Sequence, residues 1–238
     1  MSDMLHLDSL EHLTRPSVAD QVFDALRAKI LALDLPPSTK LSEVDVARQM
    51  GVSRQPVRDA FYRLSKLGFI SIRPQRSTTV SQISTNAVMQ ARFIRAAIEA
   101  QTVRVACDKL TPADHAALRD LLDLQRAAMT AKDPLAFHAL DDQFHRDLCE
   151  RAGCGFAWEI IRENKSHMDR VRFLSLSFAS QDAFGDHVAI LDAIEARDAA
   201  SAMSHMQLHL GRIRIQIERI RADNQSYFAT EVPCIPDS

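Results

Sequence analysis

The helical spacing of apolar residues is the feature that most constrains the fold of this chain. From about residue 85 to residue 222, apolar side chains recur at three- and four-residue intervals, which is typical of amphipathic helices that bury one face. The pattern is interrupted near residues 111–112, 133–134, 153–155, 180–185 and 197. These interruptions predict about six helices, which we expect to pack as an antiparallel bundle. Only 6 glycines and 2 tyrosines in 238 residues agree with a mainly α fold.

The segment before this bundle has a different pattern. Three closely spaced helices are expected within residues 17–66, and β-forming residues then follow over residues 69–83 around a polar centre. Three helices followed by a β-hairpin predict a winged helix-turn-helix domain. The expected domains are a flexible tail over residues 1–15, a winged helix-turn-helix over 16–82, a helical domain over 85–223 and a loose tail over 224–238.

Charge is distributed unevenly between the two regions. Residues 1–82 hold 11 Lys and Arg against 9 Asp and Glu, whereas residues 83–238 hold 18 against 22. Within residues 53–80, six basic side chains accompany a single acidic one, Asp59. Basic charge concentrated in this way is an electrostatic footprint for phosphates. The formal net charge of −2 therefore does not exclude a nucleic-acid partner.

A helix-turn-helix layout lies inside the basic region. Gly51 has no Cβ and so permits a left-handed turn between two helices, and Ser53 is placed to cap the second helix. The N-terminus of that second helix suits the major groove, where arginines contact phosphates and Arg or Gln side chains read base edges. The alternative, an ordinary helical hairpin with solvated arginines, is disfavoured by the basic bias and the following hairpin. The candidate DNA-binding residues are Lys40, Ser53, Arg54, Gln55, Pro56, Arg58, Arg73 and Arg76.

The helical region carries polar residues within its apolar stripes. Asp141 lies inside the stripe of the helix over residues 135–151, and His145 follows one turn later. His187 and His209 lie beside or on the stripes of two later helices. Carboxylate and imidazole groups are common ligands of divalent cations, and a buried carboxylate requires a cationic partner. The pattern therefore predicts a metal site formed by Asp141, His145, His187 and His209.

Structural hydrogen bonds are the alternative role for these residues. A core histidine more often forms a hydrogen bond than a metal bond, and the Asp141–His145 pair has the spacing of a simple helical contact. His138, Asp142 and His205 are competing candidates at helical spacing, but they project further from the centres of the stripes.

Two sets of motifs resemble known bacterial domains. Lys40-Leu-Ser-Glu, then Gly51-Val-Ser-Arg-Gln-Pro-Val-Arg58 and Arg73-Pro-x-Arg76, are similar to the winged helix of GntR-family transcription regulators. Asp141-Asp-Gln-Phe-His145, Asp186-His187 and Met206-x-x-His209 are similar to the FCD ligand-binding domain of the FadR subfamily. The resemblance implies that Asp141, His145, His187 and His209 hold a divalent metal, zinc first and nickel, manganese or iron otherwise. It also implies a small effector, often an organic acid whose carboxylate completes the coordination of the metal.

Two arginines are candidate effector-binding residues. Arg95 precedes Glu99 by one turn and matches an Arg-x-x-x-Glu pattern of the FCD domain, although a surface ion pair explains the spacing equally well. Arg172 shares a helical face with Met168 and Ser175, which places it to clamp a carboxylate, and an exposed salt bridge is the alternative.

The expected function is that of a ligand-responsive repressor and not of an enzyme. A homodimer would place two copies of the helix over residues 53–66 on a palindromic operator, because one helix reads too few base pairs. A metal-dependent hydrolase and a DNA-binding protein without an effector remain the alternatives. The four cysteines have no disulfide or metal-site spacing, and the chain has no apolar run of membrane length. Since the opening residues also lack a secretory pattern, we expect a cytoplasmic protein with no membrane partner.

Overall fold

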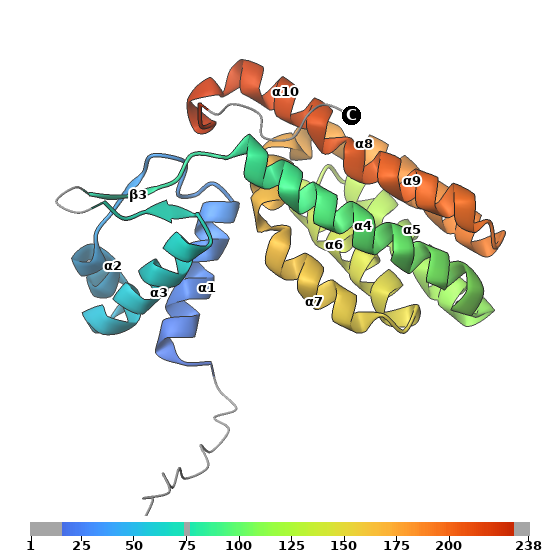
Figure 1. Ribbon diagram of the computed structural model, residues 1–238, viewed down its shortest axis with the longest axis horizontal. Coiled ribbons are helices and arrows are strands. Elements are labelled where there is room, and N and C mark those ends of the chain that lie inside the picture. Colours follow the sequence, from blue (N-terminus) through green and yellow to red (C-terminus); the bar gives the residue numbers. More distant parts are fainter. Residues whose placement is uncertain (1–15, 74–76, 231–238) are drawn as a thin grey trace, which may run out of the picture. The chain divides into compact units, whose positions relative to one another are not determined.

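The structure is a computed structural model that describes residues 16–73 and 77–230 (Figure 1). The described residues fall into two compact units. The first comprises residues up to 30 together with residues 39–81, and the second comprises residues 31–38 and the chain from residue 82 onwards. Most described residues are helical, which confirms the mainly α fold.

The first unit combines three helices with a small sheet. The helices are α1 (Val18–Leu31), α2 (Glu43–Met50) and α3 (Arg54–Lys66), and the strands are β1 (Lys40–Leu41), β2 (Ile70–Ser71) and β3 (Thr78–Val80). Strand β3 is central and antiparallel to both neighbours, with Lys40 opposite Thr79 and Ile70 opposite Val80. The hairpin β2–β3 was expected, whereas β1 was not, because a two-residue strand has no periodicity to detect. Val57, Phe61 and Leu64 of α3 are fully buried.

The turn between α2 and α3 follows the expected chemistry with one exception. Gly51 ends α2 in the left-handed region at φ 65°, and the hydroxyl of Ser42 caps the start of α2 by accepting from the Asp45 N–H at 3.3 Å. Ser53 stands at the N-cap of α3, but its side chain accepts no hydrogen bond from that helix. The expected cap is therefore absent, and the Ser53 residue is exposed.

The second unit has seven α-helices in its described residues, where about six were expected. They are α4 (Thr85–Lys109), α5 (Pro112–Thr130), α6 (Pro134–Arg151), α7 (Gly155–Asn164), α8 (Ser166–Glu195), α9 (Ala199–Gly211) and α10 (Ile213–Asp223). The break expected near residues 180–185 is wrong, because α8 runs through it for 30 residues. Gly185 lies inside α8, where a glycine lowers helix stability by about 1 kcal/mol relative to alanine. The packing of α8 against α9, α4, α10 and α5 outweighs that cost. The single helix expected after residue 197 is instead divided at Arg212 into α9 and α10.

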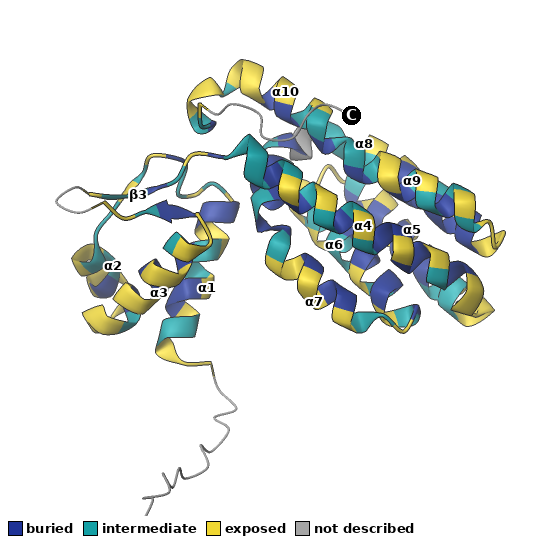
Figure 2. Ribbon diagram, viewed as in Figure 1, coloured by how far each residue is buried: buried dark blue, intermediate teal, exposed yellow. Residues whose placement is uncertain are grey.

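Helix α4 is the element around which the second unit packs. It contacts α9 along its length and also contacts α6, α7 and α8 (Figure 1). The buried faces of these helices meet in a core that includes Val103 of α4, Phe144 of α6, Ile190 of α8 and Met206 of α9. Figure 2 shows these buried faces turned inward and the exposed faces turned outward. This arrangement brings α6, α8 and α9 together beside α4.

The described part of the C-terminal segment is ordered rather than loose. Residues Gln225–Tyr227 form a 3-10 helix, and Phe228 forms a parallel β-bridge with Ile83. The expectation of a loose tail from residue 224 is therefore wrong for residues 224–229, where Phe228 is buried against the bundle. The composition of this segment did not indicate the contact, because the single residue Phe228 forms it. Among the described helices, none is both long enough and apolar enough to cross a membrane.

Candidate metal centre and DNA-binding surface

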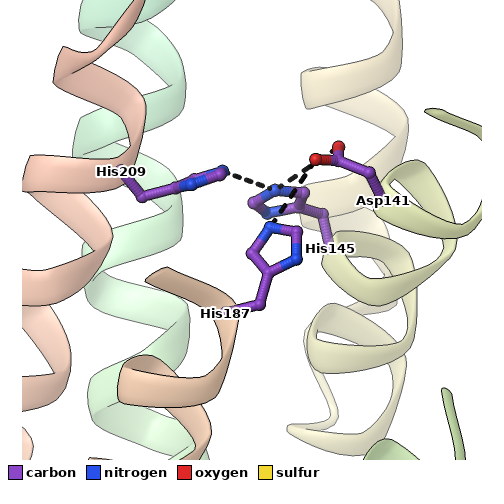
Figure 3. Close-up of side chains that lie close together, drawn as sticks. All are labelled: Asp141, His145, His187 and His209. Atoms are coloured by element: carbon purple, nitrogen blue, oxygen red, sulfur yellow. Dashed lines mark hydrogen bonds and ion pairs between the residues drawn. The ribbon is translucent and has the colours of Figure 1, made fainter. Parts of the chain in front are cut away.

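Three helices of the second unit bring four potential metal ligands together. Asp141 and His145 come from α6, His187 from α8 and His209 from α9, and the side chains point toward one another (Figure 3). One ligand atom from each residue lies within 4.8 Å of all the others. The first three residues are buried and His209 is partly buried. The sequence prediction placed these four residues on inward faces, and the structure places them at one point.

The Nε2 atoms of the histidines converge on this point. The Nε2 atoms of His145 and His209 are 3.2 Å apart. The carboxylate of Asp141 lies 3.6 Å from His187 Nε2 and 3.9 Å from His145 Nε2. Three imidazole nitrogens and one carboxylate are a donor set that divalent transition metals prefer.

The Nδ1 atom of each histidine faces an acceptor outside the cluster. Glu99 Oε2 lies 2.5 Å from His145 Nδ1, Gln125 Oε1 lies 2.9 Å from His187 Nδ1, and an Asp186 oxygen lies 3.4 Å from His209 Nδ1. The Gln125 contact is a hydrogen bond and favours the proton on His187 Nδ1, whereas the other two are close contacts without hydrogen-bond geometry. Each of those carboxylates still attracts a proton to the Nδ1 that it faces, which leaves Nε2 for a metal.

Burial and neighbouring charges set the protonation of the cluster. Burial lowers the pKa of His187 far below its usual value and also lowers the pKa of His209. Burial would raise the pKa of Asp141, but the Arg172 guanidinium and the nearby histidines hold it well below its usual range. His187 and His209 are therefore neutral and Asp141 is ionised at neutral pH, as metal binding requires.

One buried atom of the cluster supports the fit of these residues to a metal. His187 Nε2 has no hydrogen-bond partner among the described residues. Leaving a buried acceptor unsatisfied costs about 1–3 kcal/mol. A cation bound between the Nε2 atoms and Asp141 would satisfy this lone pair, so the donor set, its protonation and its geometry all fit a divalent metal.

Arg172 is the cationic partner that the buried Asp141 requires. Its Nη2 contacts the Asp141 carboxylate, and its Nη1 lies 3.1 Å from Asp142 and 3.7 Å from Asp169. The Arg172 side chain is 14% exposed, so the alternative of an exposed salt bridge is wrong. Since Arg172 already contacts three carboxylates of the protein, it is not a free clamp for a ligand.

A second group of potential ligands is occupied by cations of the protein. His138, Asp142 and Asp169 lie close enough to share an ion. The Lys165 ammonium, however, lies 2.7 Å from Asp142 and 2.8 Å from Asp169. Burial would raise the pKa of Asp142, but Lys165 and Arg172 lower it to about 2. This group is a compensated salt-bridge network rather than a metal site.

Arg95 lies inside the bundle and not on its surface. Its Nε donates to Glu99 Oε1 at 2.6 Å, and both residues are at most 2% exposed. The ion pair that the spacing suggested does form, but its expected position on the surface is wrong, because both residues are buried. The other oxygen of Glu99 contacts His145. The Nη2 atom of Arg95 is buried and has no hydrogen-bond partner among the described residues.

A pocket that is open to solvent lies beside the cluster. Two of the predicted metal ligands, Asp141 and His209, line it together with both predicted effector residues, Arg95 and Arg172. Its other walls are mixed, with Phe137, Met168, Leu210 and Ile213 supplying apolar surface and His138, Ser175, Arg212 and Gln216 supplying polar groups. Apolar walls with a few convergent polar groups are typical of small-molecule sites.

The predicted DNA-binding residues lie on the first unit. Arg54 and Arg58 project from the start of α3, with side chains 59% and 56% exposed, and each guanidinium lies 3.4 Å from Glu43. Gln55 is exposed but donates to Asp59 at 2.8 Å, and Pro56 lies in the first turn of α3. Lys40 on β1 and Arg73 after β2 are exposed, whereas Arg76 falls outside the described residues. Exposed arginines at a helix N-terminus are suited to contacts with phosphates and bases.

Comparison with known families identifies both units. Residues 18–80 match the model of bacterial regulatory proteins of the gntR family, and residues 90–212 match the FCD domain. The chain belongs to the GntR family and carries an FCD domain. It is a transcriptional regulator and not an enzyme, so the hydrolase alternative is wrong.

Curated relatives of this GntR regulator match it over most of their length. The chain is 37% identical to the HTH-type transcriptional repressor RspR of Escherichia coli K12, over 92% of this chain and 96% of that protein. It is 31% identical to a probable D-xylose utilization operon transcriptional repressor of Paenarthrobacter nicotinovorans, over 82% of this chain and 88% of the relative.

Solved structures share the fold of the GntR regulator. E. coli McbR/YncC superposes with a TM-score of 0.70 at 22% identity, over 86% of this chain and 99% of that chain. A putative GntR regulator from Rhodococcus sp. RHA1 superposes with a TM-score of 0.69 at 21% identity, over 84% and 97%.

The supporting residues around the metal cluster were not predicted. Gln125 is fully buried on α5 and lies on the same stripe as Leu118, Leu121 and Leu122. A polar residue on an apolar stripe is the signal that could have identified it. The roles of Lys165 and Asp169 depend on the side chains that α6 presents to α8, which no local pattern specifies.

We predict that Gln125→Leu weakens metal binding by the regulator. Gln125 Nε2 donates to the Leu140 carbonyl at 3.0 Å, which fixes the amide so that its oxygen faces His187. Loss of such an orienting contact weakens metal affinity by about 10- to 100-fold. Zn²⁺ affinity, measured by competition with a chromophoric chelator, checks this prediction. Gln207→Leu on the exposed face of α9 is the matched control, and equal affinities in the two variants would contradict the assignment.

Proposed function

We propose that the regulator is a repressor whose affinity for operator DNA is controlled by a small carboxylate bound at a metal in the second unit. The observation that carries this proposal is the convergence of three Nε2 atoms and Asp141 next to a pocket that Asp141, His209 and Arg95 line. A bound divalent cation would offer an open coordination position to a carboxylate oxygen. Zinc suits the nitrogen-rich donor set, and nickel, manganese and iron accept the same ligands.

The side chains of the pocket support a carboxylate effector. Arg95 Nη2 is a buried cationic donor without a hydrogen-bond partner in the described part of the chain, and a second carboxylate oxygen would satisfy it. Arg172 lines the same pocket but is held by Asp141 and Asp142, so it would reach an effector only by giving up one of these contacts. We therefore assign the main effector contact to Arg95 and the stabilisation of ionised Asp141 to Arg172.

The exposed start of α3 supports recognition of operator DNA. Arg54 and Arg58 extend from the first two turns, where side chains of a recognition helix contact bases and phosphates. Arg73 on the wing would contact the neighbouring backbone or groove. A homodimer would place two copies of α3 on a palindromic site in the cytoplasm, where one copy alone reads too few base pairs. We assign repression rather than activation because two of the relatives are named as repressors.

We predict that a carboxylate stabilises the regulator only when the metal is present. In a thermal-shift screen of small mono-, di- and hydroxycarboxylates, at least one acid raises the unfolding temperature of the Zn²⁺-loaded protein and has no effect after chelation. Arg95→Lys keeps the charge beside Glu99 but removes the Nη2 donor, so it should lose most of this shift. The exposed Arg104→Lys is the control. The effector mechanism is wrong if no acid stabilises the wild-type protein and chelation changes nothing.

We predict that Arg54→Ala and Arg58→Ala each weaken specific DNA binding without changing the fold. The loss of a base or phosphate contact costs about 1–3 kcal/mol, which corresponds to roughly 10- to 100-fold in affinity. Fluorescence anisotropy on a duplex selected from a random pool by the wild-type protein measures the change. Arg48→Ala on α2 removes an exposed charge from the same unit, with a side chain 75% exposed, and serves as the control. Sequence-specific binding that survives in both α3 variants would overturn the assignment of α3.

A further inference from the structure

The C-terminal segment of the second unit pairs with the connection between β3 and α4. The Ile83 N–H donates to the Tyr227 carbonyl at 2.7 Å, and the Ala229 N–H donates to the Ile83 carbonyl at 3.0 Å. The Gln82 side chain adds a bond of 2.9 Å to the Ser226 carbonyl. Both backbone groups of Ile83 are therefore held by residues that follow it by more than 140 positions in the sequence.

Phe228 fixes this pairing by filling a hydrophobic cluster. Its side chain is buried together with Ile83 and with residues of α4, α8 and α10. The chain reaches this position by turning at Asn224, whose N–H donates to the Ile220 carbonyl at 2.8 Å, and through the 3-10 helix. Arg221 of α10 also donates to the Ala229 carbonyl, at 3.4 Å. Burial of a phenylalanine at such a site is a strong anchor for a short segment.

The same hydrophobic cluster reaches the effector pocket. Met168 and Ile213 belong to the cluster that holds Phe228, and both side chains also line the pocket. Ile213 begins α10 directly after Arg212, which donates to Asp186, the carboxylate that faces His209. A continuous set of packed side chains thus joins the metal cluster to Ile83 within the second unit.

We propose that residues 225–229 form a clasp that fastens the β3–α4 connection to the pocket and carries changes in the pocket toward the DNA-binding unit. Gln82 is the first residue of the second unit after Ser81, the last residue of the first, so the position of Ile83 sets where the chain leaves the bundle. A metal that joins α6, α8 and α9 restrains the pocket end of α10, and the clasp passes this restraint to Ile83. This coupling rests on the metal site proposed above, whereas the clasp itself does not.

Hydrogen exchange of the full-length protein tests the proposal with Zn²⁺ as the probe. Phe228→Ala removes the anchor, and Ala229→Pro removes only the bond to the Ile83 carbonyl, at a position where the extended Phe228 backbone tolerates a following proline. Ile215→Ala, at a side chain 67% exposed on α10, is the control. In the metal-free protein, both clasp variants should speed exchange of the Ile83 amide by about tenfold or more, and the control should not.

Adding Zn²⁺ tests the coupling. Zn²⁺ should raise the unfolding temperature of all four proteins, but it should slow exchange at Ile83 only in the wild type and the control. Equal slowing in the clasp variants would overturn the coupling, and unchanged exchange in the metal-free variants would overturn the clasp. Failure of Zn²⁺ to stabilise the wild-type protein would instead refute the proposed metal site, and with it the coupling, while the metal-free comparison would still decide whether the clasp exists.

Discussion

The structure of the second unit depends on the balance of charge around the buried Asp141. An ionised carboxylate inside a helical bundle is unfavourable unless cations and hydrogen bonds compensate it. Arg172 supplies one compensating contact, and Lys165 forms ion pairs with the adjacent Asp142 and Asp169. These ion pairs connect α6 to α8 and so hold Asp141 at the point where His145, His187 and His209 converge. The same network that makes the bundle tolerate a buried charge therefore builds a candidate metal site.

The residues outside the cluster determine which imidazole nitrogens face the metal position. Glu99, Gln125 and an oxygen of Asp186 each face the Nδ1 atom of a different histidine, so the Nε2 atoms are left for a ligand. Because Glu99 also holds Arg95, the site and the pocket wall share one carboxylate. Asp186 likewise connects His209 to Arg212, next to the start of α10. A ligand bound in the pocket would thus contact residues whose partners extend to both α4 and α10.

The sequence predicts the features that depend on local spacing of residues along the chain. Asp141, His145, His187 and His209 are detectable because they interrupt apolar stripes, and Gly51 is detectable because a tight turn between helices requires a left-handed residue. The continuity of α8 through Gly185 and the division at Arg212 are not local properties, since tertiary packing decides them. The pairing of Ile83 with Phe228 is also invisible in a pattern, because two residues far apart in the chain form it. Arg172 was placed on the correct face, but only the fold shows that Asp141, Asp142 and Asp169 already occupy it.

The central claim is that the buried Asp and His residues form a metal centre, and metal analysis of the purified full-length protein tests it most directly. Elemental analysis after dialysis against a weak chelator should find about one divalent ion per chain, and X-ray absorption at its edge should show imidazole ligands. His187→Gln, which removes the imidazole whose buried Nε2 accepts no hydrogen bond from any described residue, should reduce the ion content sharply. Wild-type protein that stays free of metal after incubation with excess Zn²⁺ or Ni²⁺ would contradict the account.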